Sequence, residues 1–288
     1  MRLNVFFTPS ELAATNASAD DIYIVIDVIR ATTSLVVIFD RGARRVFAAD
    51  TIEQAQEAAA KAPGRLLCGE RNASQIPGFD YGNSPVQFAE ADLSGRDLIL
   101  TTTNGTRAFF ACPLQSVRLA GCFYNAQAVT ARALALAQER GSNIALVCAG
   151  VGGYFALDDA TCAGYLALEI QRQSPDIRVR ESVHAATTLY QTYAPPRLLD
   201  HCVSARAVTK AGLELDLMLC MTANASASVP MVAGREEETG LLMLLQYPQA
   251  DRDSHTFSPP PLGITIHALP EEVKQKCTLG GDADELSG

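Results

Sequence analysis

Residues 23–39 read YIVIDVIRATTSLVVIF, and this stretch decides the class of fold. Its first part, Tyr23–Ile26, is a run of β-branched and aromatic residues, which indicates a strand. Its second part, Ala31–Phe39, is apolar and stops at Arg41-Gly42, a signal for the C-terminal end of a helix. A strand that passes directly into a helix is the unit from which α/β sheets are built.

The same alternation continues along the chain. Further strands are expected at Leu3–Phe7, Arg45–Ala49, Leu66–Cys68, Leu98–Thr102, Val117–Ala120 and Ile144–Cys148. Further helices are expected at Ile52–Lys61, Pro85–Ala91, Thr106–Phe110, Gln127–Arg140, Leu157–Gln171, His184–Tyr193 and Ala205–Leu219. Strands that alternate with helices predict an α/β fold with a mostly parallel sheet covered on both faces.

The predicted domain boundaries follow from where this pattern weakens. We place the α/β domain at residues 1–240, with a smaller lobe that begins near Glu181, and a partly flexible extension at residues 241–288. The apolar run Leu241–Leu245 is expected to pack on the core or on a partner subunit, which weakly favours a homo-oligomer.

Composition excludes several classes of protein. The 288 residues are 48% hydrophobic and 19% charged, which is typical of a folded protein. The net charge of −9 argues against a nucleic-acid partner, because such proteins normally present a basic face. We find no signal peptide and no apolar run approaching ~18 residues, so no membrane association is expected. The eight cysteines include no C-x-x-C pair, which fits a reducing, cytoplasmic location.

Polar residues and glycines gather in four segments that each follow a predicted strand. These segments are Asp27–Thr33, Gly69–Ser84, Thr103–Arg107 and Ala149–Asp159. In open α/β sheets, ligands bind beyond the carboxyl ends of the strands. The sequence therefore predicts an active site built from these four segments.

The acids of these segments suit a hard cation. Mg²⁺ prefers one or two carboxylates, several waters and the oxygens of a substrate. Asp27, Glu70 and one of Asp158 and Asp159 are the candidates, and which of the last two takes part stays open. The alternative is that these acids only cap helices or pair with neighbouring arginines.

Two of the segments also suit an anion. Arg30, Thr32 and Thr33 stand near a helix N-terminus, where backbone N–H groups favour negative charge. Thr101–Arg107 (TTTNGTR) places hydroxyls, a glycine and an arginine between a strand and a helix, which is typical of a phosphate or sulfonate cradle. Ordinary turn and cap roles are the alternative for both.

The sequence gives little support to a cysteine phosphatase or to a nucleotide-binding loop. The one C-x₅-R match, Cys112 to Arg118, contains no glycine and runs into a predicted strand. The Gly150–Gly153 loop matches neither the dinucleotide nor the P-loop motif. A nucleotide-dependent transferase that uses this loop, and a binding module for phosphorylated or sulfonated metabolites, remain as alternatives to a phosphatase.

Taken together, the motifs resemble the 2-phosphosulfolactate phosphatase family over about residues 1–235. The matching stretches are Val25–Thr33 (VIDVIRATT), Cys68–Arg71 (CGER), Phe79–Pro85 (FDYGNSP), Leu100–Arg107 (LTTTNGTR), Asp158-Asp159 with Ala163-Gly164, and Val229-Pro230. The resemblance implies a three-layer α/β/α fold with a mixed sheet. It also implies a Mg²⁺-dependent phosphatase that hydrolyses (2R)-phosphosulfolactate to sulfolactate and phosphate, a step of coenzyme M biosynthesis.

The four segments, taken with this resemblance, give the expected roles of individual residues. Catalytic roles fall to Asp27, Arg30 and Glu70, and metal binding to Asp27, Glu70, Asp158 and Asp159. The residues expected to bind the substrate or its phosphate are Arg30, Thr32, Thr33, Arg71, Asn83, Ser84, Thr103, Asn104, Gly105, Thr106 and Arg107. Two questions stay open: whether water attacks directly or a carboxylate is phosphorylated, and whether the substrate is another small phosphate ester.

Overall fold

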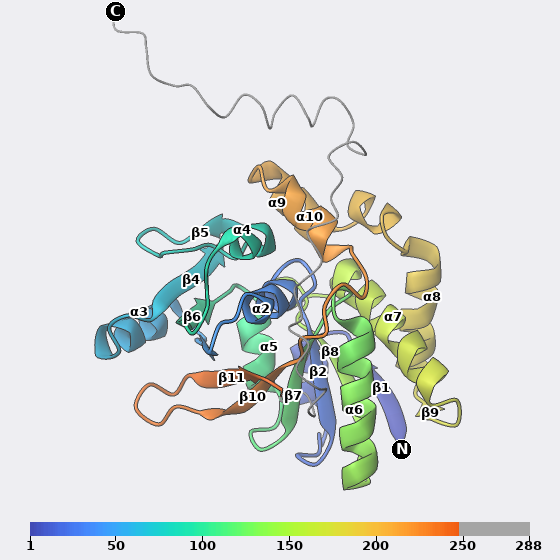
Figure 1. The fold of residues 1–288 in the computed structure, drawn as a ribbon. Coiled ribbons are helices and arrows are strands. Elements are labelled where there is room, and N and C mark those ends of the chain that lie inside the picture. The colour runs from blue at the N-terminus through green and yellow to red at the C-terminus, as the bar shows by residue number, and fades with distance from the viewer. Residues whose placement is uncertain (248–288) are drawn as a thin grey trace, which may run out of the picture. The chain divides into compact units, whose positions relative to one another are not determined.

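Short apolar strands alternate with helices throughout the computed structural model, which describes residues 1–247 (Figure 1). The strands are β1 (Arg2–Phe6), β2 (Ile22–Ile26), β3 (Arg45–Ala48), β4 (Leu66–Arg71), β5 (Ser74–Gln75), β6 (Asp97–Thr101), β7 (Val117–Gly121), β8 (Ile144–Cys148), β9 (Arg178–Val179), β10 (Pro230–Arg235) and β11 (Leu242–Gln246). The helices are α1 (Pro9–Ala13), α2 (Ala31–Asp40), α3 (Ile52–Lys61), α4 (Pro85–Glu90), α5 (Gly105–Ala111), α6 (Ala126–Arg140), α7 (Leu157–Gln173), α8 (Glu181–Tyr193), the 3-10 turn η1 (Arg197–Asp200), α9 (Val203–Lys210) and α10 (Glu214–Cys220). The predicted α/β class is confirmed.

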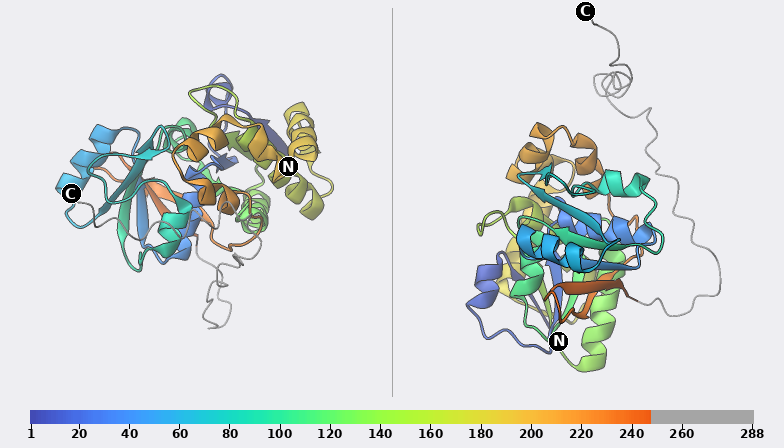
Figure 2. Two further views of the ribbon diagram at one scale, coloured as in Figure 1. Left: turned by 90° about the horizontal axis from the view of Figure 1, so that it is seen from above. Right: turned by 90° about the vertical axis from the view of Figure 1, so that its left-hand side faces the viewer.

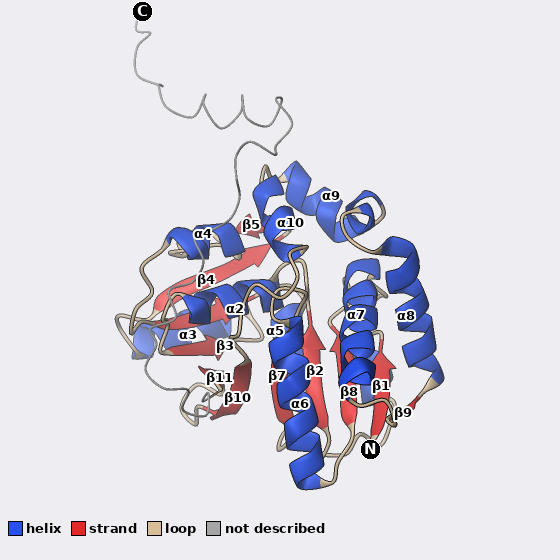
Figure 3. Ribbon diagram, turned by 45° about the vertical axis from the view of Figure 1, so that its right-hand side comes forward, coloured by secondary structure: helices blue, strands red, loops and turns tan. Residues whose placement is uncertain are grey.

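All the described strands belong to one mixed sheet, in the order β5-β4-β6-β3-β11-β10-β7-β2-β8-β1-β9. Two parallel blocks, β4-β6-β3 and β7-β2-β8-β1-β9, flank an antiparallel hairpin, β10–β11. The hairpin pairs antiparallel with β3 on one side and with β7 on the other. Figure 3 shows β4 crossing the direction of β2 and β8, so the two blocks converge from different directions. The sheet is therefore mixed, as predicted, but it is not one continuous parallel array.

The central strand β2 shows why helices cover both faces of the sheet. All five of its residues are buried. Ile22, Ile24 and Ile26 pack in a core cluster with residues of α6 and α7, whereas Tyr23 and Val25 join a second cluster with residues of α1, α2 and α5. Because side chains alternate between the faces of a strand, a strand that is buried on both faces is apolar throughout.

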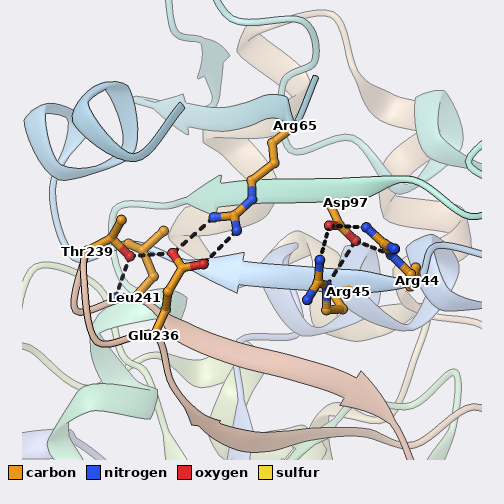
Figure 4. A network of polar contacts seen from close by, with 7 residues as sticks. All are labelled: Arg44, Arg45, Arg65, Asp97, Glu236, Thr239 and Leu241. Carbon is orange, nitrogen blue, oxygen red and sulfur yellow. Dashed lines mark hydrogen bonds and ion pairs between the residues drawn. The ribbon is translucent and has the colours of Figure 1, made fainter. Parts of the chain in front are cut away.

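Charged groups fasten strands of the first block to one another and to the hairpin (Figure 4). Asp97 at the start of β6 accepts paired hydrogen bonds from both Arg44 and Arg45, with the shortest contacts at 2.6 Å. Arg65 before β4 makes a two-bonded ion pair with Glu236, which follows β10. These ion pairs lie away from the carboxyl ends of the strands, so they stabilise the fold rather than form the site.

The C-terminal part of the domain differs from the sequence prediction. The expected helix Ala205–Leu219 is wrong as a single element, because the chain breaks between α9 and α10 at Gly212, whose φ is +74°. The apolar run Leu241–Leu245 largely forms β11 inside the sheet, so it packs on the core, and the predicted domain boundaries stay a prediction. The rest of the predicted extension lies outside the described residues, and the homo-oligomer stays a prediction.

Two further properties concern the cysteines and the helices of the described residues. The seven cysteines within the described residues are free and buried, as expected of small apolar side chains. Among the helices of residues 1–247, none has the length and apolar character needed to cross a membrane.

Candidate active site

A cavity of about 470 Å³ lies where the strand ends of the two blocks meet. One wall consists of residues that end or follow β2, β4, β6 and β8, including Asp27, Glu70, Thr103 and Val151. The opposite wall is α9, which sequence reasoning did not assign to the site. Seen from above, α9 and α10 lie over the centre of the fold, between β4 and α8 (Figure 2, left). The structure thus brings together all four of the predicted segments and adds a fifth.

Asp27 directly follows β2 and is 8% exposed. Its Oδ1 atom accepts a hydrogen bond from the Ala31 N–H at 3.3 Å, whereas Oδ2 accepts none from the described part of the chain. Thr32 and Thr33 are fully buried, and their hydroxyls donate to the carbonyls of Asp27 and Val28. These two threonines therefore shape the turn into α2, and neither lines the cavity.

The second loop approaches Asp27 closely. A Cβ atom placed on Gly105 would lie 2.6 Å from Asp27 Oδ2 and 2.5 Å from the Cβ of Ala31. Only a glycine allows this approach without a shift of the surrounding atoms. Thr106, in the first turn of α5, exchanges hydrogen bonds with Thr102 at the end of β6, which gives it a structural role.

Arg30 lines the cavity, and two hydrogen bonds hold its guanidinium group in place. Its Nη1 donates to Oδ2 of Asp216 at 2.7 Å, and its Nη2 donates to the carbonyl of Ala73 at 2.8 Å. Asp216 also accepts a 2.6 Å hydrogen bond from Ser84, which itself caps the N-terminus of α4. Sequence reasoning missed Asp216, although an aspartate between two leucines in an apolar helix (ELDLMLC, residues 214–220) is a signal of a buried polar contact.

Glu70 connects two of the loops. Its Oε1 accepts from the Thr103 N–H at 2.8 Å, and its Oε2 accepts from the Ala73 N–H at 3.0 Å. The neighbouring Arg71 turns back, donating to the Glu70 carbonyl and to the Thr101 hydroxyl. Glu70 therefore fixes the relative position of the β4 and β6 strand ends.

Asp158 and Asp159 open α7, and the structure distinguishes between them. Asp159 accepts from the Val28 N–H at 3.0 Å and from the Gly150 N–H at 2.9 Å, so it anchors α7 to the ends of β2 and β8. Asp158 is also buried, and interactions with the Ser204 hydroxyl of the α9 wall and with N–H groups at the start of α7 partly offset the effect of burial on its pKa. Neither acid is among the residues that line the cavity.

The three aspartates share an environment that disfavours negative charge. Burial raises the pKa of Asp27 to about 7, with a further contribution from the charges of Asp158 and Glu70. Burial also raises the pKa of Asp158. Burial, and then the charges of Asp158 and Asp27, raise the pKa of Asp159 well above its usual range. Acids crowded in this way would be stabilised by a bound cation.

The available carboxylates fit a magnesium ion better than a metal ion that takes all of its ligands from protein side chains. Among residues 1–247, no group of three or more His, Cys, Asp or Glu side chains is arranged to hold a metal ion. Backbone N–H groups already occupy the carboxylates of Glu70 and Asp159. Mg²⁺ needs one or two carboxylates and takes its other ligands from water and substrate. Asp27, which lines the cavity, fits that requirement, whereas the full predicted set of four acids stays a prediction.

Two polar atoms of the cavity wall have no partner. Asn83 Oδ1 and Thr103 Oγ1 are buried and make no hydrogen bond within the described chain, and both residues line the cavity. Buried polar atoms in native proteins almost always have a partner. A polar ligand in the cavity is therefore the group expected to satisfy them.

Of the other predicted residues, Arg107 lies outside the cavity wall, whereas Asn104 belongs to it. Arg107 is 60% exposed and lies 3.4 Å from Asp50. Asn104 lines the cavity, but its Oδ1 accepts from the Gly152 N–H. In the Gly150–Gly153 loop, the Gly150 N–H donates to Asp159 and the Val151 N–H donates to the Tyr154 carbonyl, so with Gly152 three of the donors that a nucleotide-binding loop would need are occupied.

The fold and this site together describe an α/β enzyme that handles a small anionic substrate. Residues 6–235 match a family model described as 2-phosphosulpholactate phosphatase. The chain is similar to a probable 2-phosphosulfolactate phosphatase of Thermotoga maritima, with 33% identity over 227 residues, which cover 78% of this chain and 92% of the relative. It is also similar to proteins of that description from Deinococcus radiodurans (34% over 249 residues; 85% and 99% covered) and Thermus thermophilus (34% over 240 residues; 83% and 97% covered). The chain belongs to the 2-phosphosulfolactate phosphatase family of phosphoric monoester hydrolases, which confirms the resemblance drawn from its motifs.

Proposed function

We propose that the protein is a Mg²⁺-dependent phosphatase that hydrolyses (2R)-2-phospho-3-sulfolactate to 3-sulfolactate and phosphate. The observation that carries the proposal is the pair of unpartnered polar atoms, on Asn83 and Thr103, in a cavity that also holds Asp27 and Glu70. A volume of about 470 Å³ accommodates a small ester with its hydration. With this substrate the reaction belongs to coenzyme M biosynthesis, in the cytoplasm.

The reaction requires a carboxylate close to phosphorus. An oxygen from water ends on phosphorus, the bond from phosphorus to the C2 oxygen breaks, and that oxygen leaves with a proton as the hydroxyl of sulfolactate. Oδ2 of Asp27 has no hydrogen bond from the described chain, so it can contact the reacting group, either as base or as nucleophile. Mg²⁺ bound at Asp27 would offset the charge of the phosphoryl oxygens.

Arg30 is positioned to bind those oxygens. Asp216 and the Ala73 carbonyl use two of the five N–H donors of its guanidinium group, and the others are available to a ligand in the cavity. The bonds from Glu70 to the two loops keep this arrangement fixed before substrate binds. Donors that are held in place before the reaction stabilise developing charge without reorganisation.

The test is phosphate release from phosphosulfolactate with Mg²⁺ and with a chelator, beside a panel of phosphorylated hydroxy acids and sugars. We expect the greatest release with phosphosulfolactate and Mg²⁺, and a fall in kcat of about 100-fold or more for Asp27→Asn. Asp20→Asn, at an exposed position, is the matched control. Preference for another ester would replace the substrate and keep the reaction. Binding of a sulfonate without any hydrolysis would support the binding module instead.

A further inference from the structure

The wall of the cavity that faces the catalytic loops has no role in the proposed reaction. This wall is the α9 segment, with Val203, Ser204, Ala207, Val208, Lys210 and Ala211 lining the cavity. Most of these side chains are small or apolar. Lys210, the last residue of α9, is the exception, because it brings a positive charge to the mouth of the cavity.

The charged side chains that line the cavity differ in whether an opposite charge is paired with them. Its ionisable lining residues are Asp27, Arg30, Glu70 and Lys210. Arg30 is neutralised by its 2.7 Å ion pair with Asp216, outside the lining. Within residues 1–247, the Lys210 ammonium makes neither an ion pair nor a hydrogen bond. Lys210 is therefore the lining residue whose positive charge remains available to a ligand.

The segment that carries Lys210 is fastened to the catalytic loops. Asp216 in the next helix, α10, accepts hydrogen bonds from Arg30, Ser84 and the Val86 N–H. Only Ala211, Gly212 and Leu213 separate the two helices. The position of Lys210 opposite Asp27 and Glu70 is thus set by buried contacts, even though its own side chain is exposed.

We propose that Lys210 determines substrate specificity by binding the second anionic group of the substrate, a sulfonate or carboxylate, while the phosphoryl group lies at Asp27. This inference rests on the proposed function, which supplies a phosphate ester with a further anion. An ammonium is a compact charge with three donors on a flexible stem, so it can reach an anion that projects from the cavity. Lys210 does not touch the reacting atoms, so it acts on binding and not on the chemical step.

The experiment compares the wild-type protein with Lys210→Met and Lys210→Arg. For Lys210→Met we expect KM for phosphosulfolactate to rise about 10- to 100-fold, because a charge-assisted hydrogen bond is lost, with kcat within about threefold. The inhibition constant of 3-sulfolactate should rise to a similar extent, whereas that of inorganic phosphate should not change. Lys210→Arg should retain most of the affinity. Lys61→Met, on α3, is the matched control and should behave as wild type.

Other results would contradict either the role of Lys210 or the proposed function on which it rests. An unchanged KM and an unchanged 3-sulfolactate inhibition constant would remove Lys210 from substrate recognition. Equal weakening of 3-sulfolactate and phosphate would indicate a general disturbance of the cavity and overturn the specific role. If the wild-type protein hydrolysed no ester, the proposed function would fail. Direct calorimetric binding of 3-sulfolactate to wild type and Lys210→Met would then test the anion site alone, and equal affinities would refute it.

Discussion

Asp216→Asn tests how the site is held in place. Asp216 is 1% exposed and Arg30 is 3% exposed, so the substitution leaves a buried guanidinium without its counter-charge. Removing one partner of a buried ion pair costs about 3–5 kcal/mol of unfolding free energy. The new amide can still accept a hydrogen bond from Ser84, so we expect a loss near the lower end, about 3 kcal/mol.

Urea unfolding at neutral pH measures this loss, and phosphate release measures its effect on the site. We expect kcat/KM to fall about 10- to 100-fold, because Arg30 loses the contact that holds it in the cavity wall. The double variant Arg30→Met with Asp216→Leu should recover much of the stability but no activity, because the unpaired charge is then gone. A single variant within about 1 kcal/mol of wild type, with unchanged kcat/KM, would show that this ion pair does not hold the site.

Two further substitutions test the fold and the approach of the loops. Partial burial raises the pKa of Asp97, but hydrogen bonds and charges from Arg44 and Arg45 outweigh it and lower the pKa to about 2 (Figure 4). Asp97→Asn should therefore cost about 1–2 kcal/mol at pH 7, with allowance for solvent at the exposed Arg44, and the difference from wild type should fade as the pH falls from about 4 towards 2, in urea unfolding series. Gly105→Ala should destabilise the protein by about 1–3 kcal/mol and lower kcat more than 10-fold, since the added methyl group would displace the Asp27 carboxylate.

Matched controls separate these effects from general damage. Gly234→Ala adds a methyl group where no atom lies within 4 Å, so it should change neither stability nor kcat. A stability difference for Asp97→Asn that persists unchanged at pH 2 would rule out the charge-based origin, because Asp97 is then almost fully protonated in the unfolded state and about half protonated in the folded state, so most of the charge-based difference should be gone. Normal kcat in Gly105→Ala would mean that Asp27 tolerates displacement, which is incompatible with its proposed contact with phosphorus.

Local sequence was sufficient to locate most of the secondary structure before α8. Ile52–Lys61 was predicted with the observed bounds, because Thr51 caps it and its residues strongly favour a helix. Elements that depend on long-range pairing were missed. The strands β10 and β11 pair with each other as a hairpin, and their place in the middle of the sheet depends on pairing with β7 and β3. No short-range pattern reveals partners more than 100 residues away.

The candidate site shows the same division. Its composition was visible in the sequence, because Asp27, Glu70, Thr103 and Asn83 follow or flank predicted strands and all line the cavity. The roles within that set were not visible. The Thr33 hydroxyl suits an anion, yet in the structure it donates to the Val28 carbonyl. A buried carbonyl at a turn needs a hydrogen-bond donor, and the nearby hydroxyl supplies one.

The sequence by itself determined the α/β class, the family and the set of loops that meet at the site, because strand–helix alternation and the polar strand ends are local properties. Only the tertiary structure decided that Asp159 is an anchor, that Asp216 holds Arg30, and that α9 closes the cavity with Lys210. Each of these depends on contacts between distant segments. The sequence alone does not distinguish one aspartate from another. The role of each carboxylate is set by whether a backbone N–H, a guanidinium group or an open cavity lies opposite it.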